Sequence, residues 1–250
     1  MTRRRLSYFN DYDKNKLIDI VKDQAGEDVN DSLLIVANRI IEIPDYSCSI
    51  NIKKGEGVED FMRKWTDKFL KGYNNRPSQR ASNPIGTIHD TILDEIISAR
   101  IPHNTTEDLN AIKYGHRLAM SAENIAGSIL EEYISNEILK YKWHCCWGET
   151  MKSIDFCNED GQLLQVKNSD NSENSSSKTV RDGTEIQHWF RRYSRTGATN
   201  WETLNQLVKI IRDEDKLTEE SYKEFVGNAV KNNPDSVYLE EASPWYGNGD

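Results

Sequence analysis

Hydrophobic residues recur every three or four positions through the first half of the chain, with polar residues between them. This period matches one face of an α-helix. The pattern predicts helices over residues 12–42, with a break at Gly26, and over residues 57–72. It predicts two more helices over residues 86–100 and 106–119.

A further helix is predicted for SAENIAGSILEEYISNEILKY, residues 121–141. Ser121 is expected to cap it, because a serine oxygen accepts backbone N–H bonds at a helix start. Glu123 would lie in the first turn, where the helix dipole favours an acid. Gly127 costs about 1 kcal/mol relative to alanine inside a helix. We therefore expect a close neighbour at Gly127, or a backbone that needs room there.

The pattern then changes to aromatic and β-branched residues. KWHCCWGETMKSIDFC, the turn signal NEDG and the run QLLQVK predict two or three strands between residues 142 and 168, packed on the preceding helix. Helices are predicted again over residues 183–195, over WETLNQLVKIIRDED with Asn200 as its cap, and over residues 218–231.

The strand QLLQVK ends in an unusual way. Lys167 follows its apolar residues, and the polar run NSDNSENSSS comes next, with almost nothing to bury. Such a Ser- and Asn-rich run is typical of a disordered linker. It also suits DNA contact, since Asn bonds bidentately to adenine and Ser bonds to phosphates.

Charge is unevenly spread along the 250 residues. The chain carries 32 Lys and Arg against 41 Asp and Glu, a net charge of −9, which taken alone argues against nucleic acid. Residues 178–195, however, hold five Lys and Arg against two Asp and Glu. A polyanion needs local positive charge rather than a positive total. The basic segment equally fits an ordinary solvated face.

The sequence lacks the signals of a membrane protein and of a zinc site. No apolar run is long enough to span a bilayer, and none follows the charged start MTRRR, so we expect a cytoplasmic protein without a membrane partner. The adjacent pair Cys145 and Cys146 follows His144, but a zinc site needs two spaced pairs. Buried reduced thiols are therefore expected.

Four residues around the predicted strands form a grouping that could carry chemistry. Gln165 and Lys167 share one strand face, because alternate side chains point the same way, and the NEDG turn can bring Asp155 beside them. Glu131 lies on the preceding helix. This order is similar to the metal-dependent nuclease core whose usual signature is D…(D/E)-x-K.

In that interpretation, the residue types follow from the chemistry of Mg²⁺, which takes oxygen ligands and only one or two protein carboxylates. Asp155 would be the central ligand, Gln165 would offer its amide oxygen or hold a water of the ion, and Glu131 would complete the site. Lys167 would orient the attacking water and add positive charge near the phosphorus. The D-x₉-Q-x-K spacing alone also fits a surface hairpin with a solvated glutamine and lysine.

A closer resemblance covers roughly residues 105–210. HRLAMSAENIAGSILEEYI, SIDFC, LLQVKNSDNSENSSS, VRDGTEIQHWFRR and TNWETL together resemble the SinI-type family of type II restriction endonucleases. The resemblance implies a PD-(D/E)XK α/β (α+β) fold, with a restriction-endonuclease-like core of a mixed central sheet flanked by helices. We expect an N-terminal helical region at residues 1–104, packed on a nuclease core at residues 105–250. That core would include a DNA-recognition segment at about 168–201 and C-terminal helices.

The same resemblance implies Mg²⁺-dependent double-strand cleavage of a short near-palindromic site, which family members read as GGWCC, where W is A or T. It implies a homodimer on double-stranded DNA, since such a site suits a two-fold protein, and a cognate DNA methyltransferase as genetic partner. The candidate DNA-contacting residues are Asn168, Ser169, Asn171, Ser172, Asn174, Lys178, Arg181, Arg191, Arg192 and Arg195. The arginines equally fit a plain exposed basic face.

Two residues depart from the superfamily pattern. Ile154 rather than proline precedes Asp155, and Gln165 replaces the usual acid, which removes a negative charge from the metal site. A second acid then becomes more necessary, with Glu131 as the first choice and Glu123 as the second. The alternative function is a catalytically inactive DNA-binding or scaffold protein on a nuclease-like core.

Overall fold

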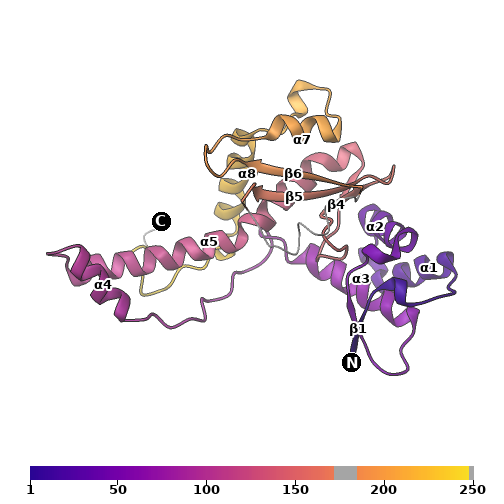
Figure 1. The fold of residues 1–250 in the computed structure, drawn as a ribbon, viewed down its shortest axis with the longest axis horizontal. Helices are drawn as coiled ribbons and strands as arrows, with labels where there is room; N and C mark the ends of the chain where they lie inside the picture. The colour runs from indigo at the N-terminus through magenta and orange to yellow at the C-terminus, as the bar shows by residue number, and fades with distance from the viewer. Residues whose placement is uncertain (172–184, 248–250) are drawn as a thin grey trace.

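The N-terminal part of the chain is a cluster of helices with a small sheet (Figure 1). The computed structural model describes residues 1–171 and 185–247. Its first elements are β1 (Thr2–Arg4), α1 (Lys14–Ala25), α2 (Asp31–Glu42), β2 (Ile50–Ile52) and α3 (Val58–Asn74). β1 and β2 pair antiparallel, and α3 packs on α1 and buries Trp65 and Phe69. The helices predicted for this part are confirmed.

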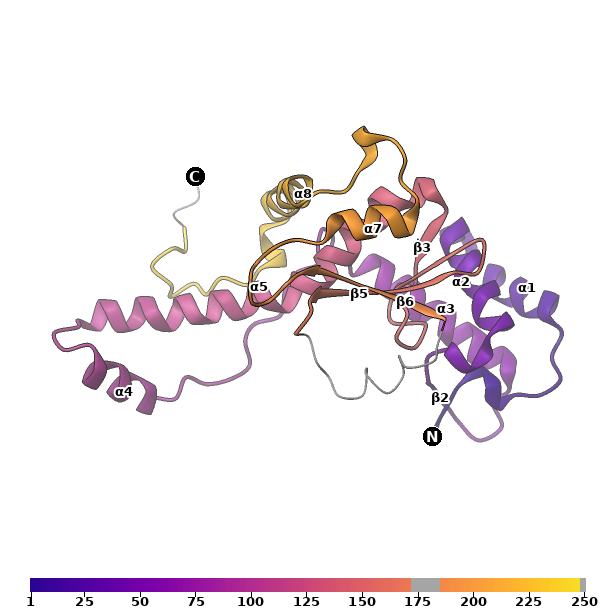
Figure 2. The ribbon, with the colours of Figure 1, turned by 45° about the horizontal axis from the view of Figure 1, so that its top comes forward.

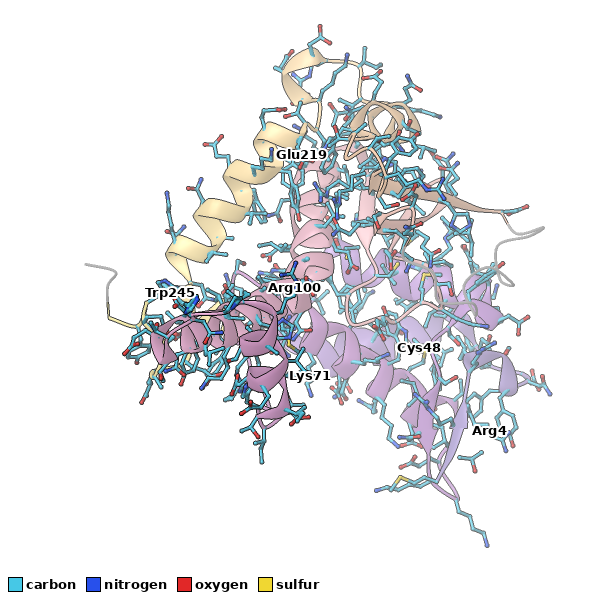
Figure 3. The ribbon with its side chains drawn as sticks, turned by 60° about the vertical axis from the view of Figure 1, so that its left-hand side comes forward. Arg4, Cys48, Lys71, Arg100, Glu219 and Trp245 are labelled. Carbon is cyan, nitrogen blue, oxygen red and sulfur yellow. The ribbon has the colours of Figure 1, made fainter. Side chains whose placement is uncertain are left out.

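An arm made of α4 (Ile92–Arg100) and the first half of α5 (Thr106–Ile138) extends from the body (Figures 1 and 2). In Figure 3, Arg100 and Trp245 lie at this arm, away from Arg4 in the N-terminal cluster. The Trp245 ring lies over Gly115, where an added Cβ would be 3.5 Å from the ring.

α5 corrects three expectations about residues 106–141. Thr105 caps one continuous helix, with a capping box to Asp108, so no second helix begins at Ser121. Ser121 lies inside α5, where its Oγ accepts the Tyr238 N–H at 2.7 Å. No proline interrupts the segment, and the C-terminal chain supplies the partner that makes a buried serine acceptable. A Cβ added at Gly127 would meet nothing within 4 Å among the described residues, so no close neighbour of the expected kind lies in that part of the chain.

The central sheet has the order β3 (Trp143–Cys145), β4 (Phe156–Asn158), β5 (Leu163–Ser169), β6 (Ile186–Arg192). The first three strands are antiparallel, as predicted, and β6 lies parallel to β5. The helix predicted over 183–195 is therefore wrong. Trp189, buried in this strand, pairs with Val166 of β5, so a tertiary partner outweighs the local helical pattern.

Helices cover the sheet and place β5 in the middle of the molecule (Figure 2). α5 packs on β3 and β5, and α2 packs on β3 and β4. α7 (Trp201–Val208) packs on β6, and α8 (Glu219–Asn232) packs on α5. Asn200 stands at the cap position of α7, but its side chain makes no capping bond to the backbone and instead accepts from the Thr203 hydroxyl at 2.7 Å.

The structure tests the expectation about the cysteines. All four cysteines are free and buried, which confirms the prediction of structural thiols. No helix within the described part of the chain is long and apolar enough to cross a membrane.

Candidate active site

An open cavity of about 530 Å³ lies where α5, β5, the 146–149 turn and the loop after α3 meet. Its charged lining residues are Arg76, Arg80, Glu131, Glu149, Asp155 and Lys167. The structure thus brings together Asp155, Lys167 and Glu131 from three separate elements. We call this cavity, with these six residues, the pocket.

Asp155 is held in the pocket by backbone bonds on both sides. Its N–H donates to the Leu164 carbonyl oxygen at 2.9 Å, and its own carbonyl oxygen accepts the Cys146 N–H at 2.8 Å. Its carboxylate Oδ2 accepts the Val166 N–H at 2.7 Å. The side chain is therefore fixed relative to β5, the strand that carries Lys167.

The pocket makes two carboxyl groups hard to ionise. Burial, and then the nearby charges of Asp155 and Glu149, raise the pKa of Glu131 to about 8, while Lys167 opposes the rise. Burial also raises the pKa of Asp155 to about 6, against the lowering effects of the Val166 N–H and Lys167. Both groups would gain from a cation in the pocket, because a cation stabilises the ionised form.

Lys167 lies on β5 opposite Phe190 of β6 and is half-buried. Its side chain forms no ion pair or hydrogen bond with any residue in the described ranges. Its charge acts on Glu131 and Asp155 through space, as their pKa shifts show. The three N–H donors of the Lys167 ammonium therefore have no acceptor among the described residues and can serve a ligand.

Gln165 is buried and does not line the pocket directly. Its Oε1 is buried without a hydrogen-bond partner among the described atoms. Such an acceptor costs free energy unless something bonds to it, so a water or an ion next to Gln165 would relieve the cost. Glu123 is exposed and outside the pocket. It precedes Glu131 by more than two helical turns, about 12 Å along the axis.

The predicted DNA-contacting residues differ in their environment, since some are exposed and others are bonded within the protein. Arg191 is engaged internally: its Nε donates to Asn168 Oδ1 at 2.8 Å, and its Nη1 pairs with Glu219 at 2.5 Å. Arg192 and Arg195 are exposed. The remaining described positions are exposed Asn171 and half-buried Ser169. Outside the described residues lie Ser172, Asn174, Lys178 and Arg181.

Three pocket residues were missed by the sequence reasoning. Glu149 follows Gly148, whose backbone packs so closely on α3 that an added Cβ would collide with the Lys68 carbonyl oxygen. Arg76 and Arg80 belong to the loop after α3, whose polar sequence with two prolines fits a connector better than a segment that contacts a partner. The available signals were the sequence Gly148-Glu149-Thr150 and the two arginines in a proline-containing loop. Neither signal indicates that the loop after α3 reaches β5.

The oxygen ligands in and near the pocket fit a hard divalent ion better than a soft one. Within residues 1–171 and 185–247, no three His, Cys, Asp or Glu side chains come together as a metal-holding group. Glu131 and Asp155 supply two carboxylates, and Gln165 Oε1 supplies an unpartnered amide oxygen. Mg²⁺ is commonly bound by one or two carboxylates together with waters, so this set is sufficient for it.

Comparisons with known proteins find related sequences over most of the chain. The family model described as SinI restriction endonuclease matches residues 66–232. The chain is 33% identical over 217 residues to the type II restriction enzyme SinI of Salmonella infantis, covering 84% of this chain and 90% of the relative. It is 42% identical over 146 residues to the type II restriction enzyme Eco47I of Escherichia coli, covering 55% of this chain and 62% of that relative.

Proposed function

Because the chain belongs to the SinI restriction endonuclease family and is a site-specific deoxyribonuclease, we propose that it uses Mg²⁺ to cut both strands of a short near-palindromic DNA site. The site proposed is GGWCC. The observation that supports the assignment of the active centre is the meeting of Asp155, Lys167 and Glu131 in one pocket.

Each of these residues would have its own role in cleavage. Asp155 and Glu131 would hold the ion, and Gln165 would offer its amide oxygen to the ion or to one of its waters. When bound, Mg²⁺ supplies Lewis acidity to the phosphate and lowers the pKa of water. Lys167 would orient the attacking water and offset charge that develops on the phosphate oxygens. The backbone bonds to Asp155 would keep this geometry fixed before DNA arrives.

The recognition surface proposed is the end of β5 and the segment that follows it, about residues 168–201. Arg192 and Arg195 are exposed there and can reach a phosphate or a base edge. Arg191 is a weaker candidate, since Glu219 and Asn168 already occupy its donors. A homodimer with one pocket for each strand matches a near-palindromic site, and a cognate DNA methyltransferase would protect that site in the host.

A plasmid digest tests the proposed function. Plasmid DNA that contains GGWCC sites is incubated with the protein in Mg²⁺, and in parallel with EDTA. Run-off sequencing of the products should place both cuts at GGWCC, and EDTA should abolish them. Fragments ending at another sequence would reject the proposed site. Specific DNA binding without cleavage in Mg²⁺ would favour an inactive DNA-binding protein instead.

A further inference from the structure

The loop after α3 is fastened to the body beside the pocket. The Gln79 N–H and the Arg80 N–H both donate to the Arg76 carbonyl oxygen, at 2.8 and 3.0 Å, which closes a tight turn. Asn233, just after α8, donates from Nδ2 to the carbonyl oxygens of Pro77 at 3.1 Å and Arg80 at 2.8 Å. Both ends of the turn are therefore tied to fixed elements, and the side chains it carries have a defined position.

Glu132 provides a third anchor, and it is the residue next to Glu131. Its side chain is 3% exposed. It accepts the Ser78 N–H at 3.1 Å and the Ser78 hydroxyl, and it pairs with Arg76 Nε at 3.4 Å. A buried carboxylate requires such partners, because an unpaired buried charge is strongly destabilising. One turn of α5 thus holds a pocket carboxyl group and the loop together.

The two arginines of this turn differ in whether their side-chain N–H donors already bond to protein groups. Arg76 is occupied: it pairs with Glu132, donates from Nη1 to the Tyr73 carbonyl oxygen at 2.6 Å, and stacks 3.8 Å above the Tyr73 ring. Arg80 lines the pocket, and its side chain makes no ion pair or hydrogen bond with any described residue. Arg80 is half-buried, so its cation lies at the pocket without a side-chain partner among the described residues.

We propose that Arg80 binds a DNA phosphate in the pocket and that Glu132 positions it by anchoring the 76–80 turn. A guanidinium presents two parallel N–H donors that match two phosphate oxygens. Arg80 would then act as a second cationic residue, reaching the backbone from a different segment than Lys167. The inference rests on the proposed function, because it assumes that the pocket receives a phosphodiester.

The charge of the pocket is consistent with this role. Asp155 and Glu149, and Glu131 when it is ionised, bring negative charge to the pocket, and without counter-charge they would repel a phosphate. Lys167 supplies one positive charge, and Arg80 supplies another from the loop. Arg76 is less available than Arg80, since its Nε and Nη1 already contact Glu132 and the Tyr73 carbonyl oxygen.

Salt dependence separates a phosphate contact from a structural role. Binding of a GGACC-containing duplex is measured in Ca²⁺ over a range of salt concentrations, for the wild-type protein, Arg80→Ala and Arg80→Lys. Each lost phosphate contact should reduce the slope of log K against log[salt] by about 0.9, so Arg80→Ala should lose about 0.9 for each subunit bound. Arg80→Lys should retain the wild-type slope, because the charge remains. Arg3→Ala removes an exposed arginine outside the pocket and is the matched control, with no change in cleavage rate expected.

Cleavage measures whether the contact matters for the reaction. In single-turnover assays with Mg²⁺, Arg80→Ala should cut about 10²-fold more slowly, as expected for losing one donor to the reacting phosphate, and Arg80→Lys should be intermediate. If Arg80→Ala keeps the wild-type rate and slope while the wild-type protein cleaves, the role of Arg80 is rejected and the proposed function stands. If the wild-type protein does not cleave in Mg²⁺, the proposed function fails, and the slope still decides whether Arg80 meets phosphate.

A double-mutant cycle tests the positioning role of Glu132. Glu132→Gln should slow cleavage and reduce the salt slope, and adding it to Arg80→Ala should cause little further loss, since both changes remove one contact. Additive losses would show that Glu132 does not act through Arg80. Thermal melts identify variants that fail to fold, and in that event the two Arg80 variants decide the proposal by themselves.

Discussion

The pocket and a second group of residues, the Arg191 cluster, both hold charged side chains near strands β5 and β6. The Arg191 cluster consists of Asn168, Arg191, Trp201, Glu219 and Tyr222. In it, Glu219 pairs with Arg191 at 2.5 Å and accepts the Trp201 indole N–H at 2.9 Å. Arg191 also lies over the Tyr222 ring, 5.4 Å from its centroid. Every charge in this cluster therefore has a protein partner.

The charged groups of the pocket differ from those of the Arg191 cluster in how they are paired. Lys167 and Arg80 have no acidic partner in direct contact among the described residues, and Glu131 and Asp155 have raised pKa values. Unpaired charges in a partly buried site cost stability, and proteins keep them chiefly where a ligand completes the pairing. The comparison teaches that pairing, rather than charge type or position near a strand end, separates a structural arginine from a candidate functional cation.

The largest effect is expected for Lys167→Ala. The rate of single-turnover cleavage should fall by about 10²–10³-fold or more, because a positioned charge that stabilises the transition state is removed. DNA binding in Ca²⁺ should be largely retained. Lys152→Ala, an exposed lysine outside the pocket, serves as the control. A mutant that cuts at near wild-type rate would show that the active site has been assigned wrongly.

Arg191→Ala should act on stability instead. The Arg191 and Glu219 side chains are only 14% and 15% exposed, so losing one partner should cost about 3 kcal/mol of unfolding free energy. Its neighbour Arg192 is exposed, and Arg192→Ala should stay within about 0.5 kcal/mol of wild type. Urea titrations measure both. Unchanged stability of Arg191→Ala, combined with weaker DNA binding, would move Arg191 from the structural group to the recognition surface.

Glu131→Gln should change how stability depends on pH. The pKa of Glu131 is raised from an ordinary 4.5 to about 8, so between these values the folded chain holds a proton that the unfolded chain has lost. Metal-free wild-type protein should therefore lose stability as pH rises through this window, and the glutamine variant should lose less. The remaining slope in the variant comes partly from Asp155, whose pKa is raised in the same direction.

Denaturant midpoints at pH 5 and pH 8 provide the measurement. Ca²⁺ should stabilise the wild-type protein more at pH 8 than at pH 5, since an ion binds the ionised carboxylates. Equal pH slopes for the wild-type and Glu131→Gln proteins would mean that Glu131 is not enclosed with the other acids of the pocket.

The smallest effect is expected for Gln165→Glu. The added carboxylate should strengthen metal binding, lower the Mg²⁺ concentration needed for half-maximal cleavage, and leave some activity. Single-turnover rates against Mg²⁺ concentration would measure the shift, with Gln165→Ala as the matched truncation. If neither variant changes the metal dependence, the buried Oε1 of Gln165 does not face the ion or its waters.

The sequence predicts much of the local structure and the meeting of Asp155, Lys167 and Glu131 in the candidate site. The apolar periods specify the helices of residues 12–42 and 57–72, and the turn signal NEDG specifies the β4–β5 hairpin that brings Asp155 beside Lys167. The position of Glu131 follows from the same order of elements. These features depend on neighbours that are close along the chain, and local patterns carry that information.

Tertiary contacts decided the rest. Residues 186–192 form a strand because β5 is available to pair with them, and Ser121 is buried inside a helix because the chain near Tyr238 donates to it. Arg191 is paired inside the fold because α8 places Glu219 beside it. Arg80 lies at the pocket because Glu132 and Asn233 anchor its loop. A side chain's partners come from elements distant along the chain, so the sequence shows which residues carry charge but not which charges remain unpaired.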